Sequence, residues 1–368
     1  TALRDRHAER TADMSQDTLS DVLRTVRLRG ALFYHVTGSG RWAAEAPPSQ
    51  AIAAAVMPDA EHVIEYHVVI SGECWAARIG EAPARLSKGD VVLFPHGDPH
   101  VMSSAPGMRA EPNVNQYYDM KVDQLPFTMA IDGAPQPGAE PSRSDVDATL
   151  VCGFLGCDVR PFNPLIATLP RMLHLRAKEG GEWIAQFMEH AVSESAAKRP
   201  GGEAMLARMS EMMFVDAVRR YVDGLPPDST GWLAGLLDRH VSRALSLMHE
   251  RPAHAWTMDE LGRDAGLSRS ALHQRFVQLI GLPPMQYLTN WRMQIASALL
   301  RSSNANVATI SLDVGYESEA AFARAFKRLV GVPPATWRRD KRQQAEQAST
   351  GEGRLSEAVL HRRNKLFH

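Results

Sequence analysis

The sequence has only three cysteines among its 368 residues, Cys74, Cys152 and Cys157. Three thiols cannot form the disulfide framework that holds small secreted domains together, so their number favours a reducing compartment. The chain also lacks a run of eighteen apolar residues and an N-terminal apolar segment of the signal-peptide type. These absences predict a cytoplasmic protein that has no membrane partner.

Motifs of the common enzyme classes are absent as well. The chain contains no nucleophile elbow, no phosphate-binding glycine loop and no dinucleotide fingerprint. The overall net charge is only −1, but segment 237–342 has 15 Lys and Arg against 9 Asp and Glu, a net +6, leaving 26 against 33, a net −7, elsewhere. A basic C-terminal region on an acidic remainder is typical of a protein that contacts nucleic acid at one end.

The C-terminal region contains the same pattern twice, at an offset of fifty residues. Segments 276–287 (FVQLIGLPPMQY) and 326–337 (FKRLVGVPPATW) match at their Phe, Leu, Gly, Pro and terminal aromatic positions. Upstream of each copy the pattern predicts two helices joined by a turn, with Gly266 and Gly315 at the turns because glycine adopts positive φ at little cost. Each copy is therefore predicted to be a helix-turn-helix.

The second helix of each copy is predicted to bury one face and leave the other free. Ser268 and Ser318 are predicted N-caps. One copy alone would also suit a core bundle or a protein-binding motif, whereas two copies with repeated caps favour DNA binding. The side chains on the free face are suited to it as well, because His, Gln and Arg can hydrogen-bond base edges and Ala can contact the thymine methyl. The predicted DNA-contacting residues are Arg269, Ser270, His273, Gln274, Ser318, Glu319, Ala320, Ala321, Arg324 and Lys327.

The first half of the chain has a β-type pattern. Short apolar runs at 63–70, 74–79 and 88–94 alternate with turn residues, which predicts a β-sandwich or a small barrel. Segment 203–223 has the broad apolar stripe of an amphipathic helix. We interpret this stripe as core, with a dimer contact as the alternative hypothesis.

Residues 237–339 resemble the DNA-binding domain of AraC/XylS-family transcription regulators. Segment 315–334 (GYESEAAFARAFKRLVGVPP) carries the family signature, and 284–300 resembles its connecting helix. The resemblance implies two helix-turn-helix units that read neighbouring major-groove segments of promoter or operator DNA, with RNA polymerase as a further partner. A helix of seventeen residues is about 25 Å long, so we expect half-sites about ten base pairs apart.

Residues 16–175 resemble the cupin-type sensor domain of one branch of that family. Gly89-x5-Pro95-x-Gly97-x2-His100 is the second cupin motif, and His67 and Glu73 have the spacing of the first, although Val69 replaces its second histidine. The resemblance implies a small-molecule effector and a homodimer. The predicted effector pocket contains His67, Glu73, Trp75, Phe94, His96 and His100.

The role of a metal is left open by the residues. Imidazole and thiolate suit zinc, so His67, His100, Cys152 and Cys157 are the predicted ligands if zinc is the cofactor. The alternatives are an organic-effector pocket without metal and a cysteine redox sensor. A cupin enzyme fused to a DNA-targeting module is the second functional hypothesis; the missing histidine favours a regulator that is not an enzyme.

The predicted fold class is α+β, with an N-terminal cupin-like jelly-roll barrel and a C-terminal all-α domain that contains two helix-turn-helix motifs. The expected segments are a flexible tail (1–15), the sensor domain (16–175), a helical linker and dimerisation region (176–224), an interdomain linker (225–236), the DNA-binding domain (237–340) and a polar tail (341–368).

Overall fold

The computed structural model describes residues 17–118, 127–132, 146–177, 182–197, 200–344 and 346. Contacts divide the chain into two compact units: one takes its residues from Thr1–Val26, Val159–Thr168 and Pro227–His368, and the other from Arg27–Asp158 and Leu169–Pro226. The tail expected at 1–15 and most of the tail expected at 341–368 lie outside the described residues. Within the described ranges, no helix has the length and apolar character that a membrane span requires.

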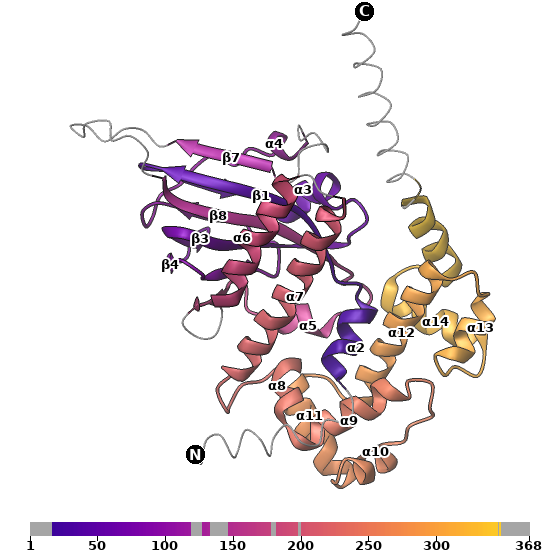
Figure 1. Ribbon diagram of the computed structural model, residues 1–368. Helices are drawn as coiled ribbons and strands as arrows, with labels where there is room; N and C mark the ends of the chain where they lie inside the picture. The colour runs from indigo at the N-terminus through magenta and orange to yellow at the C-terminus, as the bar shows by residue number, and fades with distance from the viewer. Residues whose placement is uncertain are drawn as a thin grey trace, which may run out of the picture. The chain divides into compact units, whose positions relative to one another are not determined.

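One unit, which we call the cupin unit, is built on a curled sheet (Figure 1). Its described strands run in the order β2-β6-β3-β8-β1-β7, with β4 and β5 on β3 and with β9 on β5. They are β1 (Arg29–Ser39), β2 (Ala43–Ala46), β3 (His62–Arg78), β4 (Ala84–Ser87), β5 (Val91–Phe94), β6 (His100–Ser103), β7 (Phe127–Asp132), β8 (Val146–Cys157) and β9 (Leu173–Leu175).

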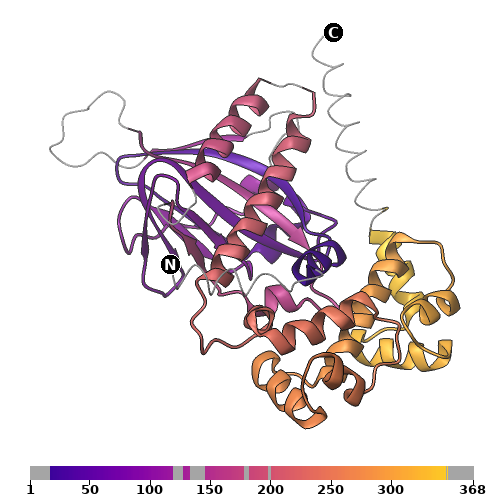
Figure 2. The same ribbon diagram turned by 60° about the horizontal axis from the view of Figure 1, so that its bottom comes forward.

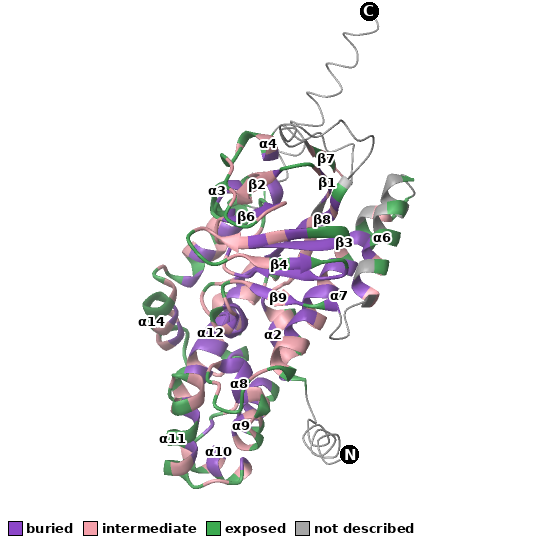
Figure 3. Cartoon of the chain, turned by 90° about the vertical axis from the view of Figure 1, so that its left-hand side faces the viewer, coloured by how far each residue is buried: buried purple, intermediate pink, exposed green. Residues whose placement is uncertain are grey.

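Strand β3 determines the curl, because its two halves pair with different strands. Its first half pairs with β5 and β8, while its second half pairs with β4 and β6. The first half is buried on both faces, as the purple colour of β3 shows in Figure 3. Since side chains alternate along a strand, Glu65 and His67 share one face of β3 and Tyr66 lies on the other.

Two helices cover the outer face of the sheet, α6 (Glu182–Ala196) and α7 (Gly202–Asp223), which lie side by side in Figure 1. The apolar stripe of 203–223 packs there as core, with Met213 and Phe214 fully buried. Gly30 of β1 permits the close approach of α7, since a Cβ at this position would lie 2.4 Å from the Ala207 carbonyl oxygen. Two short helices complete the unit, α3 (Ser49–Val56) and α4 (Asn115–Tyr118).

The other unit, which we call the DNA unit, is all helical. Helices α8 to α14 run from salmon through orange to yellow in Figure 2. Their bounds are α8 (Trp232–Leu237), α9 (Arg239–Glu250), α10 (Met258–Asp264), α11 (Arg269–Ile280), α12 (Pro284–Ser302), α13 (Val307–Asp313) and α14 (Glu319–Val330). Pairs α10–α11 and α13–α14 form the two helix-turn-helix motifs, and α12 is the connecting helix. The predicted fold class is confirmed.

Two segments from the N-terminal half of the chain complete the DNA unit. Helix α2 (Thr18–Thr25) packs on α9 and α12, where the Thr18 and Ser246 hydroxyls lie 3.1 Å apart. The backbone N–H of Phe162 donates to Gln294 Oε1 at 3.0 Å, and α5 (Pro164–Thr168) packs on α8. The expected boundaries are continuous in sequence, whereas contacts assign these two segments to the DNA unit.

Candidate functional sites: a cupin pocket and two recognition helices

The two helix-turn-helix motifs have the same local structure at the offset of fifty residues. Gly266 and Gly315 form the turns with φ of 74° and 81°. The Ser268 hydroxyl accepts from the N–H of Ala271 and the Ser318 hydroxyl from that of Ala321, each at 3.3 Å. Both predicted N-caps are confirmed, and each fixes the start of a recognition helix.

The recognition helices α11 and α14 present polar side chains to solvent. Leu272, Phe276, Phe322 and Phe326 are fully buried and hold each helix by one face. Nine of the ten predicted DNA-contacting residues are exposed on the other, and Ala321 is half-buried. The exposed residues are Arg269, Ser270, His273, Gln274, Ser318, Glu319, Ala320, Arg324 and Lys327.

Sequence reasoning missed a pair of arginines that repeat at the same offset. Arg292 on α12 donates to the carbonyls of Pro252 and His254 at 2.6 and 2.7 Å. Its counterpart Arg342 donates to the Ser303 carbonyl at 3.3 Å and to the Asn304 side chain at 2.7 Å. Each arginine therefore binds the segment that precedes its own helix-turn-helix motif.

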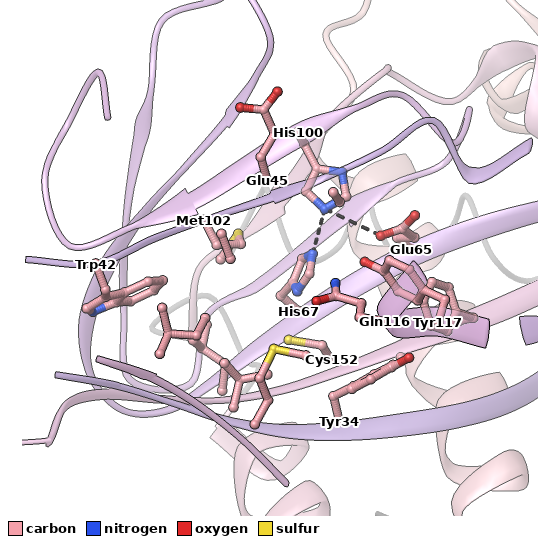
Figure 4. Close-up of a pocket in the computed structure, with 18 residues that line it drawn as sticks. Tyr34, Trp42, Glu45, Glu65, His67, His100, Met102, Gln116, Tyr117 and Cys152 are labelled. Atoms are coloured by element: carbon pink, nitrogen blue, oxygen red, sulfur yellow. Dashed lines mark hydrogen bonds and ion pairs between the residues drawn. The ribbon is translucent and has the colours of Figure 1, made fainter. Parts of the chain in front are cut away.

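The cupin unit encloses a pocket whose wall carries a buried polar cluster (Figure 4). Glu65 and His67 extend from β3 and His100 from β6, and their side chains turn toward one another. The two histidine Nε2 atoms lie 2.7 Å apart, and His100 Nε2 lies 3.7 Å from Glu65 Oε2. The remaining lining is mainly apolar and aromatic: Tyr34, Val36, Trp42, Ala44, Ala46, Met102, Tyr117, Met129, Ile131, Leu150, Gly153 and Phe154, with Glu45, Gln116 and Cys152.

Hydrogen bonding determines the tautomer of His100. Its Nδ1 lies 3.0 Å from the Asp98 carbonyl, which can only accept, so Nδ1 carries the proton and Nε2 presents a lone pair. His67 Nε2 must then donate to His100. Within the described part of the chain, His67 Nδ1 and Glu65 Oε1 are buried without a partner.

Burial keeps this cluster electrically neutral. Desolvation raises the pKa of Glu65 to about 8 and lowers the pKa of His100 to about 4. It lowers the pKa of His67 well below its usual value, and the neighbouring His100 acts in the same direction. At neutral pH the three side chains therefore offer hydrogen bonds or metal-ligand atoms without a fixed charge.

The structure brings together only some of the predicted pocket residues. His67 and His100 line the pocket, and Phe94 stacks behind His100 with ring centroids 3.6 Å apart. His96 lies outside and bonds the Leu169 carbonyl at 2.9 Å. The placement of Trp75 in the pocket was wrong as well, because it lies on the second half of β3 and does not line the cavity.

Glu73 corrects the prediction that was based on the first cupin motif. Its side chain is 53% exposed and forms an ion pair with Arg85 on the neighbouring strand. The carboxylate that joins the two histidines is instead Glu65, two residues before His67 on the same face of β3. The alternation Glu65-x-His67 was the sequence signal that could have identified it.

Of the four predicted zinc ligands, His67 and His100 converge, but the two cysteines do not join them. Cys152 on β8 lines the pocket opposite His67 in the strand register. Cys157 is buried beside His62, five residues further along β8, or about 17 Å at the rise of an extended strand. Neither thiol belongs to the cluster of possible metal ligands that Glu65, His67 and His100 form among the described residues. Burial raises the pKa of both thiols.

Comparison with known proteins identifies both units. Residues 17–223 match the Cupin family and residues 261–340 match the family Helix-turn-helix domain. A putative AraC-like transcription regulator of Streptomyces lividans is 32% identical over 326 residues, which cover 88% of this chain and 98% of that protein. The chain belongs to the AraC family of transcription regulators.

Two further relatives each cover the same share of this chain. A putative AraC-like transcription regulator of Streptomyces antibioticus is 30% identical over 325 residues, covering 88% of this chain and 98% of the relative. The HTH-type transcriptional regulator AlkR of Acinetobacter baylyi is 25% identical over 326 residues, covering 88% and 99%. As a member of the AraC family, the chain is a DNA-binding transcription regulator that contains a cupin domain.

Proposed function

We propose that this regulator is controlled by a small molecule that binds in the cupin pocket. The observation that carries the proposal is the cluster Glu65, His67 and His100, which is buried in the wall of a mainly apolar and aromatic cavity. Apolar walls with a few convergent polar groups are typical of a small-molecule site. The effector we expect is mainly apolar, with one polar group that contacts this cluster.

The strands that line the pocket also connect it to the DNA unit. Strands β1 and β8 are paired neighbours, and both contribute lining residues. Next to the ends of this pair, Arg27 and Asp158 form an ion pair at 3.1 Å. Directly beyond these two residues begin the segments that belong to the DNA unit, α2 and 159–168. A ligand that moves β1 against β8 would therefore act on both connections.

We further propose that the chain forms a homodimer and has RNA polymerase as a partner. We also propose that the chain is not an enzyme. The exposed Met205 and Met212 on the outer surface of α7 support a dimer contact at this helix. The names of the relatives as transcription regulators support the absence of catalysis. Size-exclusion chromatography with light scattering and a turnover screen on the purified chain test these two points.

Thermal-shift screening of candidate metabolites tests the central proposal. A ligand that binds the folded state raises Tm by mass action. We expect a hit to raise Tm of the wild-type chain and to change operator affinity. His100→Ala should lose both effects, while the control His96→Ala, which alters a histidine outside the pocket, should keep them. A His100→Ala chain that responds fully would contradict the pocket assignment.

A further inference from the structure

We propose that Glu65, His67 and His100 bind one divalent transition-metal ion, of the Zn²⁺ or Fe²⁺ class, with open coordination positions facing the cavity. The donor set differs from the one predicted by sequence, because a carboxylate replaces the two thiols. Two imidazoles with one carboxylate suit zinc and non-haem iron, whereas Mg²⁺ and Ca²⁺ prefer oxygen ligands throughout.

The geometry of the three side chains fits such an ion. Their ligand atoms all lie within 4.8 Å of one another. Zn–N and Zn–O bonds of about 2.0–2.2 Å at tetrahedral angles place neighbouring ligand atoms about 3.3 Å apart. The observed separations of 2.7 and 3.7 Å fall on either side of this value, so small side-chain rotations suffice.

The hydrogen bonds around the cluster support the same conclusion. The bond from His100 Nδ1 to the Asp98 carbonyl aims the Nε2 lone pair at the cluster, which is the usual outer contact of a metal-binding histidine. Without an ion, Glu65 Oε1 has no partner among the described residues although it is buried. A bound cation would interact with this carboxylate and would separate the two histidine Nε2 atoms.

A buried aromatic ring, which does not line the cavity, packs against the two histidines. The Phe94 ring stacks on His100 and meets the His67 ring edge to face, with centroids 6.0 Å apart. The cavity lining is mainly apolar, and residues such as Leu150 and Ile131 offer no ligand atoms. Three protein ligands would therefore leave coordination positions for an exogenous donor.

Metal content of the purified full-length chain tests the site directly. After treatment with EDTA and dialysis against Zn²⁺, we expect one ion per chain by inductively coupled plasma mass spectrometry. We expect Glu65→Gln and His100→Gln to weaken Zn²⁺ binding by more than about 100-fold, since loss of an outer-shell contact alone costs about 10–100-fold. The matched controls Glu73→Gln and His96→Gln should bind like the wild-type chain.

Two outcomes would overturn the site, and the first uses the wild-type chain, so it does not depend on a variant folding. A wild-type chain that binds no Zn²⁺ overturns it, and so does a folded Glu65→Gln chain that binds Zn²⁺ as tightly as the wild type. Co²⁺ loaded in place of Zn²⁺ reports on the donors: d–d bands without thiolate charge transfer support the assigned ligands, and thiolate charge transfer contradicts them. Azide should shift the d–d bands; an unchanged spectrum would contradict open positions.

Operator binding separates this inference from the proposed regulation. DNA affinity of the metal-free chain is measured by fluorescence anisotropy. If the chain binds one Zn²⁺ but no metabolite changes its operator affinity, the metal site is supported and the effector proposal is contradicted. If the chain binds no Zn²⁺, and a metabolite still changes its operator affinity after complete removal of metal, only the metal site is contradicted.

Discussion

His249 is a buried histidine that folding holds neutral in the DNA unit. Its ring stacks on Trp291 with centroids 4.1 Å apart, and its Nε2 accepts from the Tyr287 hydroxyl at 2.8 Å. The same hydroxyl accepts from Trp232 Nε1 at 2.8 Å. Burial lowers the pKa of His249 to about 3, so this group should make the stability of the unit depend on pH.

The direction of that dependence follows from proton binding. Between about pH 3 and pH 6.5 the unfolded chain protonates His249 and the folded chain does not, so stability falls as pH falls through this window. From pH 6.5 to pH 5 the loss attributable to His249 is about 2 kcal/mol. Urea unfolding at both pH values should show a correspondingly smaller loss for His249→Gln, which stays neutral; equal losses would refute the assignment.

Single residues of the cupin pocket were only partly predictable. His67 and His100 were correctly placed together because each lies in a cupin-like motif. Glu73 was misplaced because spacing alone does not show which half of the bent strand β3 faces the cavity. Cys157 was misplaced because convergence depends on the register of β8, and that register is set by pairing with distant strands.

At the scale of elements, the contact between β1 and α7 depends on a residue without a side chain. A Cβ on Gly30 would lie 2.0 Å from the Ser210 hydroxyl and 2.4 Å from the Ala207 carbonyl oxygen, which is backbone and cannot rotate away. Gly30→Ala should therefore destabilise the cupin unit by about 1–3 kcal/mol. In Gly224→Ala the nearest atom is 3.5 Å away, and thermal denaturation should show a change within about 1 kcal/mol.

Recognition helix α14 gives a second prediction at this scale. Arg324 is exposed on it and could pair with a guanine edge, a contact that contributes about 1–3 kcal/mol of discrimination. Arg324→Ala should weaken binding to the selected operator by a correspondingly larger factor than binding to random DNA, as measured by anisotropy. Arg239→Ala, on α9, serves as the control. Equal losses on both DNAs would make Arg324 a phosphate contact.

The helices of the DNA unit were predictable because their signals are local. Caps, turn glycines and buried faces lie within a few residues of one another, and each of these signals occurs in both copies of the repeat. The assignment of α2 and 159–168 to this unit was not predictable, because it depends on contacts such as Phe162 with Gln294 across 132 positions.

At the scale of the whole molecule, the proposed regulation requires that the pocket and the DNA unit prefer matching states. A ligand shifts DNA affinity only through a difference in its own affinity for those states, which is typically worth about 1–3 kcal/mol. The chain leaves the paired strands β1 and β8 at Arg27 and Asp158, and the ion pair between them holds the two connections together. Asp158 is nearly inaccessible to solvent, whereas the Arg27 side chain is 33% exposed, so solvent screens the pair in part.

Asp158→Asn should therefore reduce the response to a ligand more than it reduces binding of either ligand or DNA. The substitution keeps the size of the side chain and removes the charge that attracts Arg27. The operator affinity is measured with and without the effector identified by thermal shift. For Asp158→Asn we expect the ratio of these two affinities to move toward one, while the effector still raises Tm. The control Asp59→Asn removes an exposed carboxylate 3.8 Å from Arg29, near the same end of β1, and should keep the wild-type ratio. If Asp158→Asn keeps that ratio as well, the coupling does not pass through this ion pair, and the contacts of Thr18 and Phe162 inside the DNA unit become the next positions to vary.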